Sequence, residues 1–408
     1  MPTPSMIDAW HEVPPTAGLP LVWHDLLPGS ADLGDAMATY LKLPETQIEC
    51  SGTAALVIAL TTLRQASSRR KVILPAYTCP LVALAVAHCG LQPVLCDLRA
   101  GSFDLDHDRL MQLCDESTLA VIPTHLGGRI ADLAPVLDIA HRVGASVIED
   151  AAQALGAYAH GQAVGSIGDI GFWSLAVGKG LTLYEGGVLY ARDAALRQSL
   201  RQISTKLVQS NAGWELRRIA ELLGYWALYH PHGLRLAYGW PLKRALLRDD
   251  LVAAVGDDFD ADIPLHRVSH WRQAVGARAL MRLPVFQQQS RRLAEQRKQT
   301  LAQVPGIRVL DDAPGTQGTW PFFMVMMPTA RARDAALETL WTAGLGVSRL
   351  FIHALPDYGY LAHLFQASDV PNARDFAARM LTVSNSPWLS DAQLARVVSA
   401  LGDAVNRG

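Results

Sequence analysis

Lys179 lies in the stretch SLAVGKGLTLYEGG, residues 174–187, where it is the only basic residue. Two glycines flank it, and most of the other residues are small or apolar. A charged amine is costly to bury without a partner, so such a lysine loses its charge, finds an acidic partner or is used covalently. An uncharged amine in an apolar pocket is a nucleophile suited to Schiff-base chemistry. Lys179 is therefore the first candidate for catalysis.

Asp150 is the second candidate, because it ends the apolar run SVIED. A carboxylate at the end of a buried strand has few neighbours to solvate it. Two interpretations are equally open: Asp150 caps the following helix, or it pairs with a cationic atom of a ligand.

The stretch SGTAAL, residues 51–56, opens a helical pattern with small residues. Exposed N–H groups and the helix dipole favour an anion at such a position, and a phosphate would fit. For this motif alone, an ordinary capped helix is the more common interpretation. Ser174 could donate a further hydrogen bond to a bound phosphate.

These candidates together match what pyridoxal phosphate requires. The cofactor needs a lysine for its aldehyde, a carboxylate for its ring nitrogen and donors for its phosphate. The carboxylate keeps the pyridinium protonated, so that the ring can take up electrons from a substrate. No single candidate is specific, but their combination and order predict this cofactor.

The elements that position these residues alternate between strand and helix from about residue 50 to residue 150. The strands are continuous apolar runs such as KVILPA and SVIEDA, which indicates an α/β fold with a mostly parallel sheet and helices on both faces. Open sheets of this kind bind ligands beyond the carboxyl ends of their strands. The candidate residues follow the strands, as this rule requires.

The length of 408 residues suits two domains. We expect a cofactor-binding large domain at 1–262, with a basic, aromatic-rich insertion at about 200–262. A smaller α+β domain is expected at 263–408.

Charge, cysteine content and hydropathy limit the compartments in which the protein could work and the classes of partner it could bind. A net charge of −2 gives no reason to expect nucleic acid, and the five cysteines show no metal-ligand spacing. Free thiols suggest a reducing compartment. The sequence shows no signal-peptide pattern and no apolar run as long as a membrane span, so the expected location is cytoplasmic and no metal is expected.

The runs PAYTCP, VIEDAAQALGA and VGSIGDIGFWSLAVGKGLTLYEGG resemble the DegT/DnrJ/EryC1/StrS family of sugar aminotransferases. The resemblance is close over residues 45–195 and looser in the C-terminal part. It implies the fold-type-I architecture, pyridoxal phosphate and a homodimer with its active site at the interface. It further implies amino-sugar and polysaccharide biosynthesis, in which a keto-sugar, expected to be nucleotide-linked, becomes an amino sugar with glutamate as the donor.

The same resemblance assigns roles to individual residues. Lys179 would bond the cofactor aldehyde and move a proton, while Asp150 would pair with the pyridine nitrogen. Gln153 would lie against the ring near its 3-hydroxyl. The other expected cofactor contacts are three residues at the phosphate and one bordering the pocket: Gly52, Thr53, Ser174 and His125.

The chain also departs from the family. Cys79 stands where an aromatic residue often stacks on the cofactor, so either Tyr77 compensates or the stacking is absent. Residues 265–268, LHRV, replace a common Asn-Tyr-Arg-Met run that reaches the partner's phosphate, leaving Arg267 as the candidate substitute. Lys179 argues against the dehydratase branch, which has histidine there.

The insertion leaves two interpretations open for residues 217–247. The favoured one is a packed helical lid or dimer arm; the other is a membrane-interface segment, with a lipid-linked acceptor. Two alternative functions also remain: another pyridoxal-phosphate reaction on a non-sugar or lipid-linked ketone, and a non-catalytic regulator or scaffold. The joint presence of four site residues argues against the non-catalytic alternative: Lys179, Asp150, Gln153 and Ser174.

Overall fold

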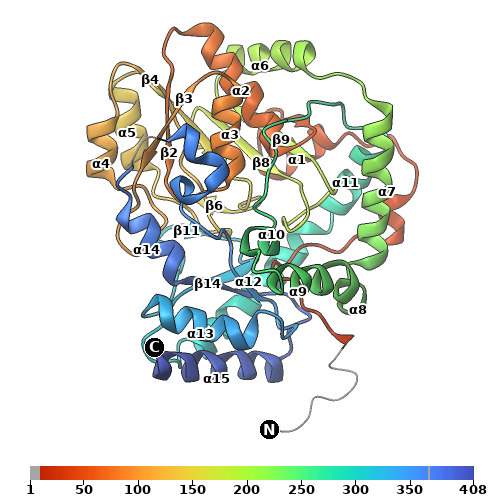
Figure 1. The fold of residues 1–408 in the computed structure, drawn as a ribbon. Coiled ribbons are helices and arrows are strands. Elements are labelled where there is room, and N and C mark those ends of the chain that lie inside the picture. The colour runs from red at the N-terminus through yellow and green to blue at the C-terminus, as the bar shows by residue number, and fades with distance from the viewer. Residues whose placement is uncertain (1–9, 366–367) are drawn as a thin grey trace.

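The computed structural model describes residues 10–365 and 368–408. Figure 1 shows a larger domain with a central sheet and a smaller domain that carries the C-terminal helix. The central sheet has seven strands in the order β1-β9-β8-β5-β4-β2-β3. Five neighbouring strands are parallel, and β9 and β1 complete the sheet through antiparallel pairs. The bounds are β1 (Gln47–Glu49), β2 (Lys71–Pro75), β3 (Gln92–Cys96), β4 (Thr118–Val121), β5 (Ser146–Asp150), β8 (Ile170–Ser174) and β9 (Gly187–Ala191).

Helices cover both faces of this sheet. Alternate residues of β2 show why: Val72 and Leu74 pack in one core cluster, while Ile73 packs in another on the opposite face. The first face is covered by α2 (Gly52–Ala66), α3 (Pro80–His88) and α6 (Ala194–Leu207). The other face is covered by α1 (Leu33–Leu41), α4 (His107–Leu113), α5 (Ala134–Arg142) and α11 (His270–Leu280). The expected mostly parallel, two-sided sheet is therefore confirmed.

The smaller domain is built on an antiparallel sheet with the order β10-β12-β14-β13. Its strands are β10 (Arg308–Val309), β12 (Phe322–Met326), β13 (Val347–Ser348) and β14 (Met380–Ser384). Its helices are α13 (Ala330–Leu340), α14 (Pro371–Arg379) and α15 (Asp391–Arg407). A short third sheet, β11 (Thr316–Gln317), β6 (Tyr158–Ala159) and β7 (Gln162–Ala163), pairs strands from both parts of the chain.

Helix α12 (Leu283–Leu301) joins the two domains. Leu283 packs in the core of the large domain, whereas Leu301 packs in the core of the small domain. Helix α11, which precedes it, packs with α1 on the large sheet. We infer that the domain transition lies within α12, later in the chain than the expected boundary at residue 263.

The expected insertion is helical. After α6 come α7 (Ala212–Leu228), α8 (Pro231–Leu234), the π-helical turn η3 (Arg235–Gly239), α9 (Trp240–Leu246) and α10 (Leu251–Val255). Figure 1 shows α7 along the side of the large domain, with α9 and α10 nearer the small domain. Within the described part of the chain, no helix has the length and apolar character needed to cross a membrane.

Candidate active site

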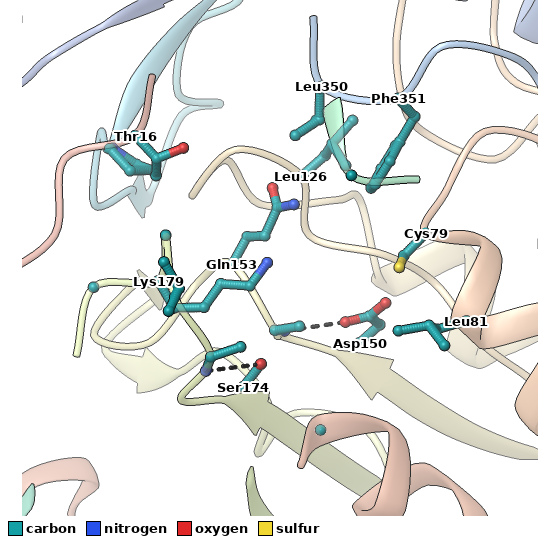
Figure 2. A pocket seen from close by; sticks show the side chains of 18 of the residues that line it. Thr16, Cys79, Leu81, Leu126, Asp150, Gln153, Ser174, Lys179, Leu350 and Phe351 are labelled. Atoms are coloured by element: carbon teal, nitrogen blue, oxygen red, sulfur yellow. Dashed lines mark hydrogen bonds between the residues drawn. The ribbon is translucent and has the colours of Figure 1, made fainter. Parts of the chain in front are cut away.

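A pocket of about 510 Å³ lies beyond the carboxyl ends of β5 and β8. Seven of the expected site residues line it: Gly52, Thr53, Cys79, Asp150, Gln153, Ser174 and Lys179. Figure 2 shows the side chains of Lys179, Gln153 and Asp150 around one space. The strand–helix pattern predicted that these residues would meet at the carboxyl edge of the sheet, and in the structure they line one pocket there.

Lys179 lies in the loop 175–186 between β8 and β9. The loop turns at Gly178, whose φ of +80° is a conformation that glycine adopts readily. Burial is the main cause that lowers the pKa of the Lys179 amine, and the nearby Cys79 and Asp150 side chains only partly offset it. A lowered pKa favours the uncharged amine, the form that attacks an aldehyde.

Asp150 ends β5 and is almost fully buried. Its Oδ1 accepts a hydrogen bond from the Ala152 N–H at 3.0 Å. Its Oδ2 accepts no hydrogen bond from the described residues. Burial raises the pKa of this carboxyl, against the lowering effects of the Ala152 N–H, Lys179 and His125. A buried carboxylate with a free oxygen is well placed to pair with a cationic ring nitrogen.

The phosphate end of the candidate site is the N-terminus of α2. Ser51 caps the helix by accepting from the Ala54 N–H at 2.9 Å. The next two residues, Gly52 and Thr53, lie in the first turn, whose N–H groups have no acceptor in a preceding turn. A Cβ on Gly52 would lie 3.1 Å from the Cβ of Ser174, so glycine lets β8 approach this helix end closely.

Gln153 and Cys79 line the space between these two ends. The Gln153 Oε1 accepts from the Gly127 N–H at 2.7 Å, which fixes the orientation of the side-chain amide. Burial raises the pKa of the Cys79 thiol to about 12, so this side chain is a neutral, soft contact. The stacking ring that the family often has is replaced here by a thiol.

Tyr77 does not supply the missing ring, and that expectation is corrected. Its side chain is fully buried outside the pocket lining. The hydroxyl donates to the Phe351 carbonyl at 3.1 Å and accepts from the Phe351 N–H at 3.2 Å. The ring packs edge-on against Phe351 and Phe376, so tertiary packing turns it away from the pocket.

His125 also lies outside the lining, and its expected place at the border of the pocket is corrected. Its Nδ1 accepts from the Ala131 N–H at 3.1 Å, which leaves Nε2 to donate to Glu149 at 3.1 Å. His125 nevertheless supports the site through its backbone, since its N–H donates to the Asp150 carbonyl at 2.9 Å.

Glu185 lies in the same loop as Lys179 and borders the pocket. Its carboxylate connects this loop to α7. Its carboxylate accepts from Trp214 Nε1 at 3.2 Å and pairs with Arg218. His266 is buried 3.7 Å from the same carboxylate, whereas Arg267 is exposed. The sequence indicated none of these contacts, because they join residues far apart in the chain.

The pocket also includes residues for which the sequence predicted no role. Thr16 comes from the N-terminal segment, and Arg349 and Phe351 come from the segment after β13. No local motif marks them, although the run SRLFIHALPDYGYL that contains two of them follows the family pattern. The site is therefore built from both domains and from the N-terminal segment.

The residues present fit pyridoxal phosphate. Lys179 would hold its aldehyde, and the free Asp150 Oδ2 would pair with its ring nitrogen. The N-terminus of α2 and Ser174 would bind its phosphate, and Gln153 would lie against the ring.

Two curated relatives align with most of this chain. It is 25% identical over 387 residues to dTDP-4-dehydro-2,3,6-trideoxy-D-glucose 4-aminotransferase of Saccharopolyspora spinosa, with 94% of this chain and 91% of the relative covered. It is 28% identical over 372 residues to GDP-perosamine synthase of Caulobacter vibrioides, with coverage of 90% and 87%.

Solved structures share the fold. DesI, determined in the presence of its TDP-sugar product, superposes with a TM-score of 0.74 at 20% identity and covers 98% of this chain and 94% of its own. The aminotransferase TlmJ of Streptoalloteichus hindustanus gives a TM-score of 0.71 at 23% identity, with coverage of 92% and 90%.

The model of one protein family matches residues 23–225 and 266–402, which is most of the chain. The match spans both domains and includes Lys179, Asp150, Gln153 and Ser174. The chain belongs to the DegT/DnrJ/EryC1/StrS aminotransferase family and is a pyridoxal-phosphate-dependent aminotransferase.

Proposed function

We propose that this aminotransferase converts a nucleotide-linked keto-sugar to an amino sugar, with glutamate as the amino donor. The observation that carries the proposal is the pocket around Lys179, which holds the cofactor residues and extends to Thr16, Phe259 and Phe351. The names of two relatives, which refer to a dTDP-linked and a GDP-linked sugar, support a nucleotide-linked substrate.

Bound pyridoxal phosphate supplies an aldehyde that carries the amino group and a ring that accepts electrons. Lys179 Nζ, with its lowered pKa, would accept the proton from the donor Cα and return a proton to the carbon of the acceptor ketone. Asp150 would hold the proton of the ring nitrogen, and Gln153 would orient the ring. The mostly apolar lining excludes water from these transfers.

The first test is the absorption spectrum of purified protein with pyridoxal phosphate, before and after borohydride reduction. We expect a visible band that borohydride removes, with the cofactor then covalently attached to the peptide that contains Lys179. Attachment to a different lysine, or no attachment, would overturn the site assignment.

The second test separates the donor from the acceptor. Glutamate, glutamine, alanine and aspartate would each be mixed with the cofactor-loaded enzyme, and loss of the visible band would be followed. The amino form would then be offered dTDP-, GDP- and UDP-linked 4-keto-6-deoxy sugars. Loss of the band with glutamate and its return with a keto-sugar would support the proposal, whereas return only with non-sugar ketones would contradict it.

We further propose that the enzyme works as a homodimer, with Arg267 reaching the partner's phosphate site. The exposure of Arg267 supports this role. Sedimentation equilibrium tests the oligomeric state, and Arg267→Ala should weaken cofactor binding while leaving that state unchanged. A monomeric active enzyme would rule this arrangement out.

Contact of residues 217–247 with a membrane stays a prediction. Tyr229 is buried, which fits the packed-lid interpretation, while Trp226, Trp240 and Leu247 are exposed. Co-sedimentation with vesicles rich in phosphatidylglycerol tests the contact. Binding unchanged by Trp240→Ser together with Leu247→Ser would contradict it.

A further inference from the structure

The segment 226–265 is left unmatched between the two parts that fit the family model. It overlaps the insertion expected at about 200–262 and is here called the insert. It nevertheless contributes eight residues to the pocket that contains Lys179: Tyr238, Val255, Gly256, Asp257, Phe259, Asp262, Ile263 and Pro264. One side of the active-site pocket thus comes from a segment that lies outside the match to the family model.

The part of the insert that faces the pocket carries no lysine or arginine. Val255, Phe259, Ile263 and Pro264 are apolar, Asp257 is buried in hydrogen bonds with the protein, and Asp262 adds one exposed carboxylate. A diphosphate would find no counter-charge on this surface. The surface suits an uncharged part of a ligand, such as the less polar face of a sugar ring.

Asp257 fixes the insert to the small domain. Its Oδ2 accepts from the Tyr358 hydroxyl at 2.5 Å and from the Ile352 N–H at 3.0 Å. Its carbonyl accepts from the Tyr360 hydroxyl at 2.5 Å. All of these partners belong to the segment 348–360, which also brings Arg349, Leu350 and Phe351 into the pocket.

A second attachment lies in the π-helical turn η3. Its Tyr238 lines the pocket close to Ser348, at the end of β13. Its Arg235 pairs with the buried Glu12 at 2.8 Å. The insert is therefore held at two places on the small-domain side, on each side of the helices α9 and α10.

The attachment lies away from the reacting amine. Figure 2 shows Leu350 and Phe351 on the side of the pocket opposite to Ser174 and separate from Lys179. A five-carbon donor that reacts at Lys179 is short, whereas a keto-sugar linked to a nucleotide must extend further through the pocket.

We propose that the insert is the wall that selects the keto-sugar acceptor, and that Asp257 is a positioning residue that holds this wall against the segment 348–360. The inference rests on the proposed function in naming a sugar as the acceptor. The wall would contact the acceptor and leave the donor half-reaction unaffected.

The first test measures access to the loaded site and needs no acceptor. Hydroxylamine and the bulkier O-benzylhydroxylamine both capture the cofactor aldehyde, and the visible band reports the rate. In Asp257→Ala and Tyr358→Phe, we expect the bulky reagent to react about tenfold faster, because a wall without its hydrogen bonds opens more often. The rate with hydroxylamine should stay within about twofold of wild type, since a small reagent does not need this opening.

Two variants serve as controls. Asp257→Asn keeps a carbonyl oxygen that can accept both hydrogen bonds, so it should restore the wild-type ratio of the two rates. Asp260→Asn removes an exposed carboxylate of the same insert and should change neither rate. If the ratio of the two rates is the same in wild type, Asp257→Ala and Tyr358→Phe, the insert does not act as a wall of the pocket and the proposal is wrong.

The second test splits the two half-reactions. With glutamate alone, the rate of band loss in Asp257→Ala should match wild type, whereas the KM for the accepted keto-sugar should rise about tenfold. An equal change in both half-reactions would overturn the acceptor-specific role. If wild type reacts with glutamate and with no keto-sugar, the proposed function fails, and the two hydroxylamine reagents still decide whether the insert is a wall.

Discussion

At the scale of single residues, Lys179 is the most directly testable. Lys179→Ala removes the amine and should abolish turnover, and Lys179→Arg should fail too, because a guanidinium stays charged and forms no Schiff base. Both variants should still bind pyridoxal phosphate non-covalently, which equilibrium dialysis can measure. Steady-state transamination by either variant would count against the assignment.

Asp150 should matter for the reaction more than for the fold. Asp150→Asn keeps the size of the side chain and removes its negative charge, so the ring nitrogen would lose its protonated form. We expect kcat to fall by about a hundredfold or more, because an opposite charge shifts a pKa by about 1–3 units. Thermal unfolding without cofactor should change little. An unchanged kcat would contradict the pairing.

Asp257 gives a prediction with a defined direction in pH. Burial raises the pKa of its carboxyl from 3.8 to about 6, against lowering effects of Tyr358, the Ile352 N–H and Arg349. Between these two values the folded state binds more protons than the unfolded state, so stability falls as the pH rises. From pH 5 to pH 7.5 this loss is about 1 kcal/mol.

Asp257→Asn does not titrate, so it should escape this loss. The melting temperature of Asp257→Asn minus that of wild type should therefore increase from pH 5 to pH 7.5. Scanning calorimetry of both proteins at both pH values would measure this difference. A constant difference between the two proteins would indicate that Asp257 does not titrate in this range.

The residues that the sequence predicted correctly as pocket residues share a simple origin. Asp150 and Ser174 end parallel strands, Gly52 opens a helix, and the carboxyl ends of parallel strands meet at one edge. Tyr77 and His125 occupy similar positions in the chain, yet their side chains point into the protein interior. Only the packing of distant residues, such as Phe376 for Tyr77, determines that direction.

At the scale of elements, the close approach of α2 and β8 makes Gly52 sensitive to substitution. In Gly52→Ala the new methyl group would press on Ser174, 3.1 Å away, and so push β8 from the helix end. We expect the Kd for pyridoxal phosphate to rise about tenfold, because the phosphate would lose well-placed donors. Fluorescence titration of the apoprotein would measure it.

Gly224 provides the matched control, because it lies inside α7 and a Cβ added there would meet no atom within 4 Å. Gly224→Ala should leave the cofactor Kd unchanged and stabilise the protein by about 1 kcal/mol, the difference in helix propensity. Similar effects of both substitutions on cofactor binding would show that the position of Gly52 has no special role.

The insert shows which elements the sequence could not place. Residues 217–247, most of which belong to the insert, were expected only as a lid, an arm or a membrane segment, because their composition mixes basic, aromatic and apolar residues. The attachment of the insert depends on Asp257 and Tyr358, which are 101 residues apart in the chain. No local pattern predicts such a pair, so the wall becomes visible only when the domains are packed together.

At the scale of the whole molecule, the pocket joins three parts of the chain that lie far apart in the sequence. Thr16 comes from the N-terminal segment, Lys179 from the loop between β8 and β9, and Arg349 from the segment after β13. A ligand that fills this pocket binds the folded arrangement and has no comparable site in the unfolded chain. Its binding energy therefore stabilises the entire assembly of domains.

Removal of the cofactor should accordingly lower the melting temperature of wild type. At a cofactor concentration of about 100 times its Kd, the stabilisation is about 2.7 kcal/mol, which corresponds to several degrees. Gly52→Ala should show a smaller shift because it binds the cofactor more weakly, and Gly224→Ala should show the full shift. Calorimetry with and without pyridoxal phosphate would measure all three proteins. A shift confined to one of two separate transitions would mean that the cofactor stabilises only one domain, and that the pocket does not couple them.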